Sequence, residues 1–185
     1  PGSGVYTIQS AFPMEGELEV ALFERAWNMV IERHPILRTS FHWEGLAKPQ
    51  QVVHRRAAAS ITRIDWRDRD AADQERDLAA LLQADRQRGF DLKRPPLLRL
   101  TLIQRAAQRY TFVWSFHHLL LDGWSVALVR GEVFQLYRAL CVGAAAELPA
   151  SPAYREYIGW WQRQSQAEAE AFWRRHLAGI SAPTP

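Results

Sequence analysis

Two adjacent histidines stand where the chain passes from an apolar, strand-like run into an apolar helical pattern, in the segment 115–125, SFHHLLLDGWS. A neutral imidazole has an unperturbed pKa of about 6.5, so it can accept a proton from an attacking amine or hydroxyl near neutral pH. Adjacent side chains on an extended chain point to opposite faces, so His117 and His118 are expected to face different surroundings. We predict that His118 is the general base, or at least the group that orients the nucleophile.

Two residues after the histidines complete this candidate site. Asp122 follows His118 across a turn, and a carboxylate at that position needs a partner if it is buried. Arg33 and Arg38, both in the segment 33–41 (RHPILRTSF), are the candidate partners. Gly123 would leave room for a narrow substrate arm to approach the backbone.

Other kinds of site fit this sequence poorly. Two adjacent histidines seldom reach one metal ion, and no cysteine or carboxylate cluster completes a ligand set, so we predict no metal site. A serine-hydrolase elbow of the form Gly-x-Ser-x-Gly is absent. The single cysteine, Cys141, lies between Leu140 and Val142 and is expected to be an inert, buried thiol in a reducing compartment. The nucleophile is therefore expected to belong to a substrate.

The elements that position the site follow from the apolar periodicity. Apolar residues recur at helical spacing from Leu18 to Ile31, and Pro35 ends the run, which predicts an amphipathic helix. The alternation from Leu37 to Trp43 predicts a half-buried strand. Weaker strand candidates are 51–54 and 61–64.

A second helix and a hairpin lead into the motif. The helix is predicted from about Asp70 to Arg88, where Gly89 ends it. The runs Leu97–Gln104 and Tyr110–Phe116 predict a hairpin, whose second strand is nearly all apolar and therefore central in its sheet.

A third helix is expected to follow the motif and to end near Gly143. One or two further helices are expected between Tyr154 and Ala178. The residues of the third helix that we expect to face inward are Trp124, Leu128, Val129, Val133, Leu136 and Leu140.

Composition sets the broad class of the protein. Of 185 residues, 48% are hydrophobic and 23% are charged, which is typical of a soluble globular chain. The net charge is +3, but arginines alternate with acids and form no basic block, so we expect no nucleic-acid partner. No apolar run approaches the roughly 20 residues that span a bilayer, and no signal peptide is visible. We expect a cytoplasmic protein without a membrane partner.

Four segments, in order along the chain, resemble the condensation domains of nonribosomal peptide synthetases, a branch of the chloramphenicol-acetyltransferase-like superfamily. RHPILRTSF at 33–41 resembles the family's Arg-His-x-x-Leu-Arg-Thr-x-Phe segment, and HHLLLDGWS at 117–125 resembles its central motif. FDLKRPPLLRL at 90–100 resembles the stretch before the central hairpin. YREYIGWWQRQ followed by AFWRRHLAG resembles the end of the N-terminal lobe.

The resemblance implies a fold and a reaction. The fold is an α/β sandwich, one lobe of a pseudo-dimer, with a mixed sheet flanked by helices; the periodicity agrees on element types and leaves strand order open. The reaction is amide formation between a carrier-bound acyl or peptidyl donor and a carrier-bound aminoacyl acceptor, both on phosphopantetheine arms, with no cofactor bound directly. His117, His118, Asp122 and Gly123 would form the active site, and Trp124 and Ser125 would border the substrate tunnel.

The same resemblance implies partners and missing parts. The expected partners are upstream and downstream peptidyl carrier proteins, a C-terminal lobe and an adjacent adenylation domain. Residues 1–185 would form the N-terminal lobe, without the family's opening motif and C-terminal lobe, so the isolated chain is expected to be inactive or nearly so. The ending Asp-Gly-Trp-Ser is similar to that of domains joining an L-configured donor to an L-configured acceptor. Alternatives are a stand-alone acyltransferase of the superfamily and a non-catalytic recruitment module.

Overall fold

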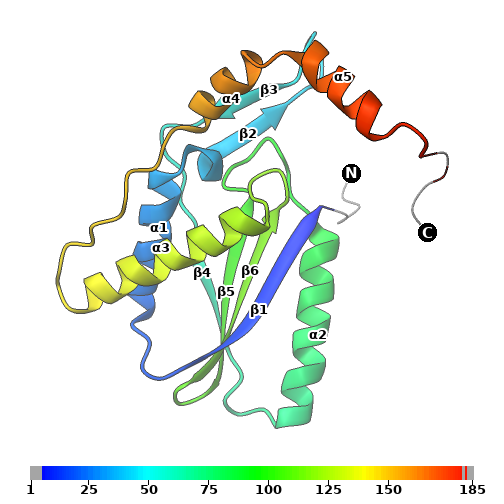
Figure 1. Ribbon diagram of the computed structural model, residues 1–185. Coiled ribbons are helices and arrows are strands. Elements are labelled where there is room, and N and C mark those ends of the chain that lie inside the picture. Colours follow the sequence, from blue (N-terminus) through cyan, green and yellow to red (C-terminus); the bar gives the residue numbers. More distant parts are fainter. Residues whose placement is uncertain (1–5, 181, 183–185) are drawn as a thin grey trace. The chain divides into compact units, whose positions relative to one another are not determined.

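The computed structural model describes residues 6–180 and 182, which divide between two compact units, 1–149 and 150–185. The first unit contains a four-stranded sheet, a two-stranded sheet and three long helices (Figure 1). The second contains two short helices. The histidine motif lies in the first unit.

The main sheet is mixed, as predicted. Its order is β1 (Thr7–Glu15), β6 (Arg109–His117), β5 (Leu98–Ala106) and β4 (Ile61–Asp65). The first three are antiparallel to their neighbours, and β4 is parallel to β5. The predicted hairpin and the central place of its second strand are confirmed. Strand β1 was not predicted, because Pro13 interrupts its pattern; a proline is tolerated there since β1 is an edge strand.

Helices cover both faces of this sheet. Figure 1 shows α1 (Val20–Arg33) and α3 (Gly123–Cys141) on one face and α2 (Ala71–Arg88) on the other. The alternation of β6 sorts its side chains accordingly. Phe112, Trp114 and Phe116 pack in the core that contains α1 and α3 residues, and Val113 packs in the core with Leu78, Leu81 and Leu82 of α2.

Local signals set the ends of α2 as predicted. The carboxylate of Asp70 accepts a hydrogen bond from the backbone N–H of Asp73 at 2.8 Å and caps the N-terminus. At the other end Gly89 has φ of +58°, a backbone conformation that glycine adopts without strain. The chain therefore reverses sharply at Gly89.

The second sheet differs from the sequence prediction. Strand β2 (Thr39–His42) pairs with β3 (Gln50–Val53), and a short 3₁₀ helix η1 (Pro35–Arg38) precedes it. The strand predicted from Leu37 to Trp43 is therefore shorter. Proline fixes φ near the helical value and favours the first turn of a helix, which explains the 3₁₀ turn.

Helix α3 buries a narrower face than predicted. Val129, Val133 and Leu136 are buried, as expected, but Trp124 and Leu128 are 85% and 68% exposed. Because a helix turns about 100° per residue, these two side chains lie off the stripe formed by the buried positions. Cys141 is also exposed, so its predicted burial is wrong.

The second unit contains α4 (Tyr154–Gln162) and α5 (Gln166–His176), so the predicted helical region is two helices. Neither helix has a buried residue. The rings of Tyr154, Tyr157 and Trp160 lie one after another, with centroids 5.6 and 5.8 Å apart. Among the described residues of the whole chain, no helix combines the length and apolar character needed to cross a membrane.

Candidate active site

The central strand carries both histidines to one end of the main sheet. His117 is the last residue of β6, and His118 follows it. The backbone N–H of His117 donates to the carbonyl of Leu97 at 3.0 Å, and that of His118 donates to the carbonyl of Tyr6 at 2.8 Å. Hydrogen bonding to the neighbouring chain segments thus continues past the end of the strand and fixes the backbone of both residues.

His118 is exposed, and its ring is held by one local hydrogen bond. Nδ1 lies 2.9 Å from the carbonyl oxygen of Leu121. A carbonyl can only accept, so Nδ1 carries the proton and donates it, which leaves a lone pair on Nε2. The turn is closed by the N–H of Leu120, which donates to the carbonyl of His117 at 2.9 Å. The ring is therefore fixed in the tautomer that a base needs.

His117 has different surroundings. It is half-buried, with its ring 5.9 Å from that of Tyr6 and 6.4 Å, edge to face, from that of Phe90. Its Nδ1 accepts the backbone N–H of Leu119 at 3.2 Å. Burial, with a smaller contribution from the charge of His118, lowers the pKa of His117 below its usual 6.5. His117 is therefore neutral near pH 7.

A hollow of about 380 Å³ opens beside the two rings. It is lined by Tyr6, Leu92, His117, His118 and Leu119. Among the residues that the structure describes, no carboxylate, lysine or arginine lines it, so the imidazoles are its groups that titrate near neutral pH. The hollow can accept an uncharged group next to the free nitrogen of His118.

Asp122 has a structural role at the start of α3. Its Oδ1 accepts hydrogen bonds from the Oγ–H of Ser125 at 2.7 Å and from the N–H of Ser125 at 2.8 Å. These two bonds, the side-chain one first, lower the pKa of Asp122. The carboxylate is exposed and is the N-cap of α3. It therefore holds the helix that begins directly after the histidine turn.

Neither predicted arginine contacts Asp122. Arg33 Nε donates to Glu132 of α3 at 3.3 Å, and its Nη2 donates to the carbonyl of Pro149. Arg38 donates to the carbonyls of Glu32 and His54. The predicted pairing is corrected for a simple reason: Asp122 is exposed and needs no buried counter-charge.

Glu132 is the functional neighbour that the sequence analysis missed. Its Oε2 lies 2.6 Å from His34 Nε2, so one carboxylate contacts both residues of the Arg33-His34 pair. The signal was present in the helical pattern, because Glu132 stands among the buried positions Val129, Val133 and Leu136. A carboxylate on that face requires a partner from the helix packed against it.

The three residues after Asp122 form an open surface. A methyl group added at Gly123 would meet nothing within 4 Å. Trp124 is 85% exposed, and the hydroxyl of Ser125 is engaged by Asp122. The space predicted in front of Gly123 is present, whereas Trp124 and Ser125 do not line the hollow beside His118.

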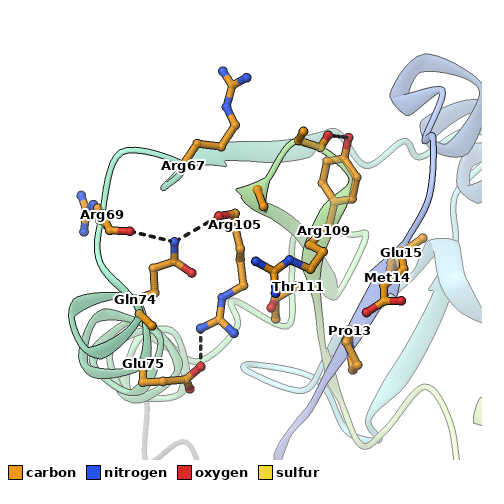
Figure 2. A pocket seen from close by; sticks show the side chains of 14 residues that line it. Pro13, Met14, Glu15, Arg67, Arg69, Gln74, Glu75, Arg105, Arg109 and Thr111 are labelled. Carbon is orange, nitrogen blue, oxygen red and sulfur yellow. Dashed lines mark hydrogen bonds and ion pairs between the residues drawn. The ribbon is translucent and has the colours of Figure 1, made fainter.

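A larger hollow, of about 700 Å³, lies at the other end of β6 and is not the candidate site (Figure 2). Arginines line it, but each of three is paired with an acid: Arg67 with Asp65, Arg69 with Asp77, and Arg105 with Glu75. No histidine or cysteine of the described residues lines it. Within the described part of the chain, no group of three or more potential ligands could hold a metal ion.

Comparison with known proteins gives a consistent result. A family model described as "Condensation domain" matches residues 1–184. One protein of the linear gramicidin synthase of Brevibacillus parabrevis is 50% identical over 182 residues, covering 98% of this chain and 4% of that protein. Bacitracin synthase 3 of Bacillus licheniformis is 36% identical over 183 residues, covering 99% of this chain and 3% of that protein.

A solved structure supports the same fold. The variant starter condensation domain of rhizomide synthetase, in complex with C8-CoA and Leu-SNAC, matches with a TM-score of 0.86 and 28% identity. The match covers 99% of this chain and 42% of that one. The predicted α/β fold is thereby confirmed, and this chain spans less than half of that solved chain and a few per cent of the synthases.

Proposed function

The chain belongs to the condensation-domain family, and from this premise we propose that it takes part in amide-bond formation during nonribosomal peptide synthesis. The donor is an acyl or peptidyl thioester, and the acceptor is the amine of an aminoacyl thioester. The observation that carries the assignment of the base is the bond from His118 Nδ1–H to the Leu121 carbonyl, which leaves Nε2 free at the hollow.

The residues of this chain assist the reaction as follows. The acceptor amine attacks the thioester carbonyl; the C–N bond forms, the C–S bond breaks and the carrier thiolate leaves. His118 Nε2 accepts the amine proton and passes it to the thiolate sulfur, so the base is regenerated. The Leu121 carbonyl stabilises the imidazolium through Nδ1–H. His117, kept neutral by burial, adds no second positive charge.

The substrates and partners belong to the same proposal. Both substrates are carried on phosphopantetheine, one by an upstream and one by a downstream carrier protein, and the complexes of the rhizomide synthetase relative with C8-CoA and Leu-SNAC support this chemistry. The ending Asp122-Gly123-Trp124-Ser125 favours an L-configured donor and acceptor. We further propose that this chain works as an N-terminal lobe beside a second lobe and an adenylation domain, in keeping with its coverage of 42% of that relative.

The test is intact-mass analysis of loaded carrier proteins after incubation with the two-lobed protein. The acceptor carrier should gain the donor's mass, and His118→Ala should abolish the gain. His118→Gln keeps a hydrogen-bonding group without an imidazole base, and it should remain as inactive as the alanine variant.

His42→Ala is the matched control. Its ring lies in the two-stranded sheet and bonds the hydroxyl of Ser40 at 2.9 Å, outside the hollow. It should transfer at the native rate. No mass gain with native protein and correctly loaded carriers would refute the proposal, and a fully active His118→Ala variant would refute the role of the base.

A further inference from the structure

An arginine on β5 fastens the C-terminal end of α2 to the main sheet near the histidines. Arg99 pairs in register with Ser115, two residues before His117. Its Nε donates to Asp85 Oδ1 at 2.5 Å, Nη2 donates to the Asp85 carbonyl at 2.9 Å, and Nη1 donates to the Gly89 carbonyl at 2.6 Å. The guanidinium thus satisfies two carbonyls at the end of the helix, where positive charge is favourable.

The carboxylate that receives Arg99 is itself fixed from a third strand. Gln9 of β1 donates to Asp85 Oδ2 at 2.7 Å and to the carbonyl of Leu82 at 3.1 Å. Burial acts to raise the pKa of Asp85, but hydrogen bonds from Arg99, Ser115 and Gln9 together hold that pKa below its usual value. The acid is therefore ionised near neutral pH, and the orientation of Arg99 is set by several bonds at once.

The flat face of this guanidinium leads to the histidines through one aromatic ring. Arg99 Cζ lies 3.9 Å from the ring centroid of Phe90, and the ring of Phe90 meets that of His117 at 6.4 Å and 84°. The reversal at Gly89 places Phe90 there, immediately after the carbonyl that Arg99 binds. A continuous set of contacts therefore runs from the end of α2 to the ring of His117.

His117 in turn supports the turn that orients His118. Its Nδ1 accepts the N–H of Leu119, its carbonyl accepts the N–H of Leu120, and Leu121 holds His118 Nδ1. We propose that Arg99 is a positioning residue: by clamping the end of α2 it seats Phe90 against His117, and so holds the turn that fixes the tautomer and direction of His118. This inference rests on the proposed function only for its catalytic consequence.

The test compares Arg99→Met with Arg105→Met. Arg105 also lies on β5 and donates to an acid of α2, Glu75, at 2.7 Å, and the two arginine side chains are 20% and 22% exposed. It sits at the other end of the strand, in the hollow of Figure 2, away from the histidines. Both variants remove one arginine tie between β5 and α2, so a purely structural effect should appear in both.

Histidine ring nitrogen NMR on the full chain measures the positioning directly. In Arg99→Met the share of His118 in the Nδ1–H tautomer should fall, and the pKa of His117 should rise as Phe90 loosens and water reaches the ring. The groups that face His117 are Tyr6, Phe90 and His118, and none of them is replaced. Arg105→Met should leave both histidine spectra unchanged.

Transfer kinetics of the two-lobed protein give the second readout. Arg99→Met should lower kcat by about ten- to a hundredfold with little change in KM, because misplacing a catalytic group by about 1 Å can cost about a hundredfold. Phe90→Leu should do the same, Phe90→Tyr, which keeps the ring, should restore the native values, and Arg105→Met should match the native kcat. If Arg99→Met does not fold, the Phe90 pair decides.

Native histidine spectra together with native kcat in Arg99→Met, or in Phe90→Leu, would overturn the inference. Equal losses in Arg99→Met and Arg105→Met would overturn it as well. A native protein that transfers nothing between correctly loaded carriers would overturn the proposed function instead, while the histidine spectra would still decide the positioning role.

Discussion

Replacing Glu132 by alanine should destabilise the protein more than replacing Asp122 by alanine. Glu132 on α3 binds His34 at 2.6 Å and Arg33 at 3.3 Å, both at the end of α1, and it therefore ties the two helices that cover one face of the sheet. Asp122 only caps α3 from an exposed position. The opposite ranking would be expected if an arginine of the 33–41 segment paired with Asp122.

The size of the Glu132 effect follows from its burial. Exposed ion pairs contribute about 0.2 to 1 kcal/mol, and breaking a buried pair costs about 3 to 5 kcal/mol. The side chains of Arg33, His34 and Glu132 are 24%, 19% and 18% exposed, which places them between these limits. We expect Glu132→Ala to lower the free energy of unfolding by about 2 kcal/mol, or Tm by about 4 to 8 °C for a chain of this length.

Urea unfolding followed by tryptophan fluorescence is the assay, because Trp27 and Trp114 are buried in the core beside α1. Glu32→Ala is the control, since Glu32 is exposed on the same helix as Arg33 and should change stability by less than about 0.5 kcal/mol. If Glu132→Ala unfolds at the same urea concentration as Glu32→Ala, or later than Asp122→Ala, the reasoning is refuted.

Three further predictions concern pH and surface. Asp85 has a folded pKa below 3.8, so its stabilisation is present above about pH 4 and is lost as pH falls; Asp85→Asn should flatten the acid limb of urea midpoint against pH. His117 binds its proton less readily when folded, so stability should decline as pH falls below about 6.5, and NMR should show His117 titrating below that value. Leu128→Ser should keep the native midpoint within about 0.5 kcal/mol, because the side chain is exposed; a larger loss would contradict the packing of α3.

Local patterns were sufficient for most elements. The apolar run of β6, the hairpin with β5, and the caps of α2 at Asp70 and Gly89 each depend on residues close together in the chain. The edge strand β1 was missed because an edge carries little apolar signal and tolerates Pro13. The exposure of Trp124 was missed because helical periodicity shows a stripe of apolar residues but not how wide a stripe the neighbouring elements cover.

By itself the sequence determined the family, the element types and the identity of the candidate base, because the motif around His118 is contiguous and its chemistry resides in residue type. Only the tertiary structure decided the partners of the charged groups: Glu132 rather than Asp122 for Arg33, Asp85 for Arg99, and the Leu121 carbonyl for His118. The physical reason is that an ion pair or ring contact depends on distance and burial. For residues about 100 positions apart, such as Arg33 and Glu132, these are set by how helices pack on the sheet.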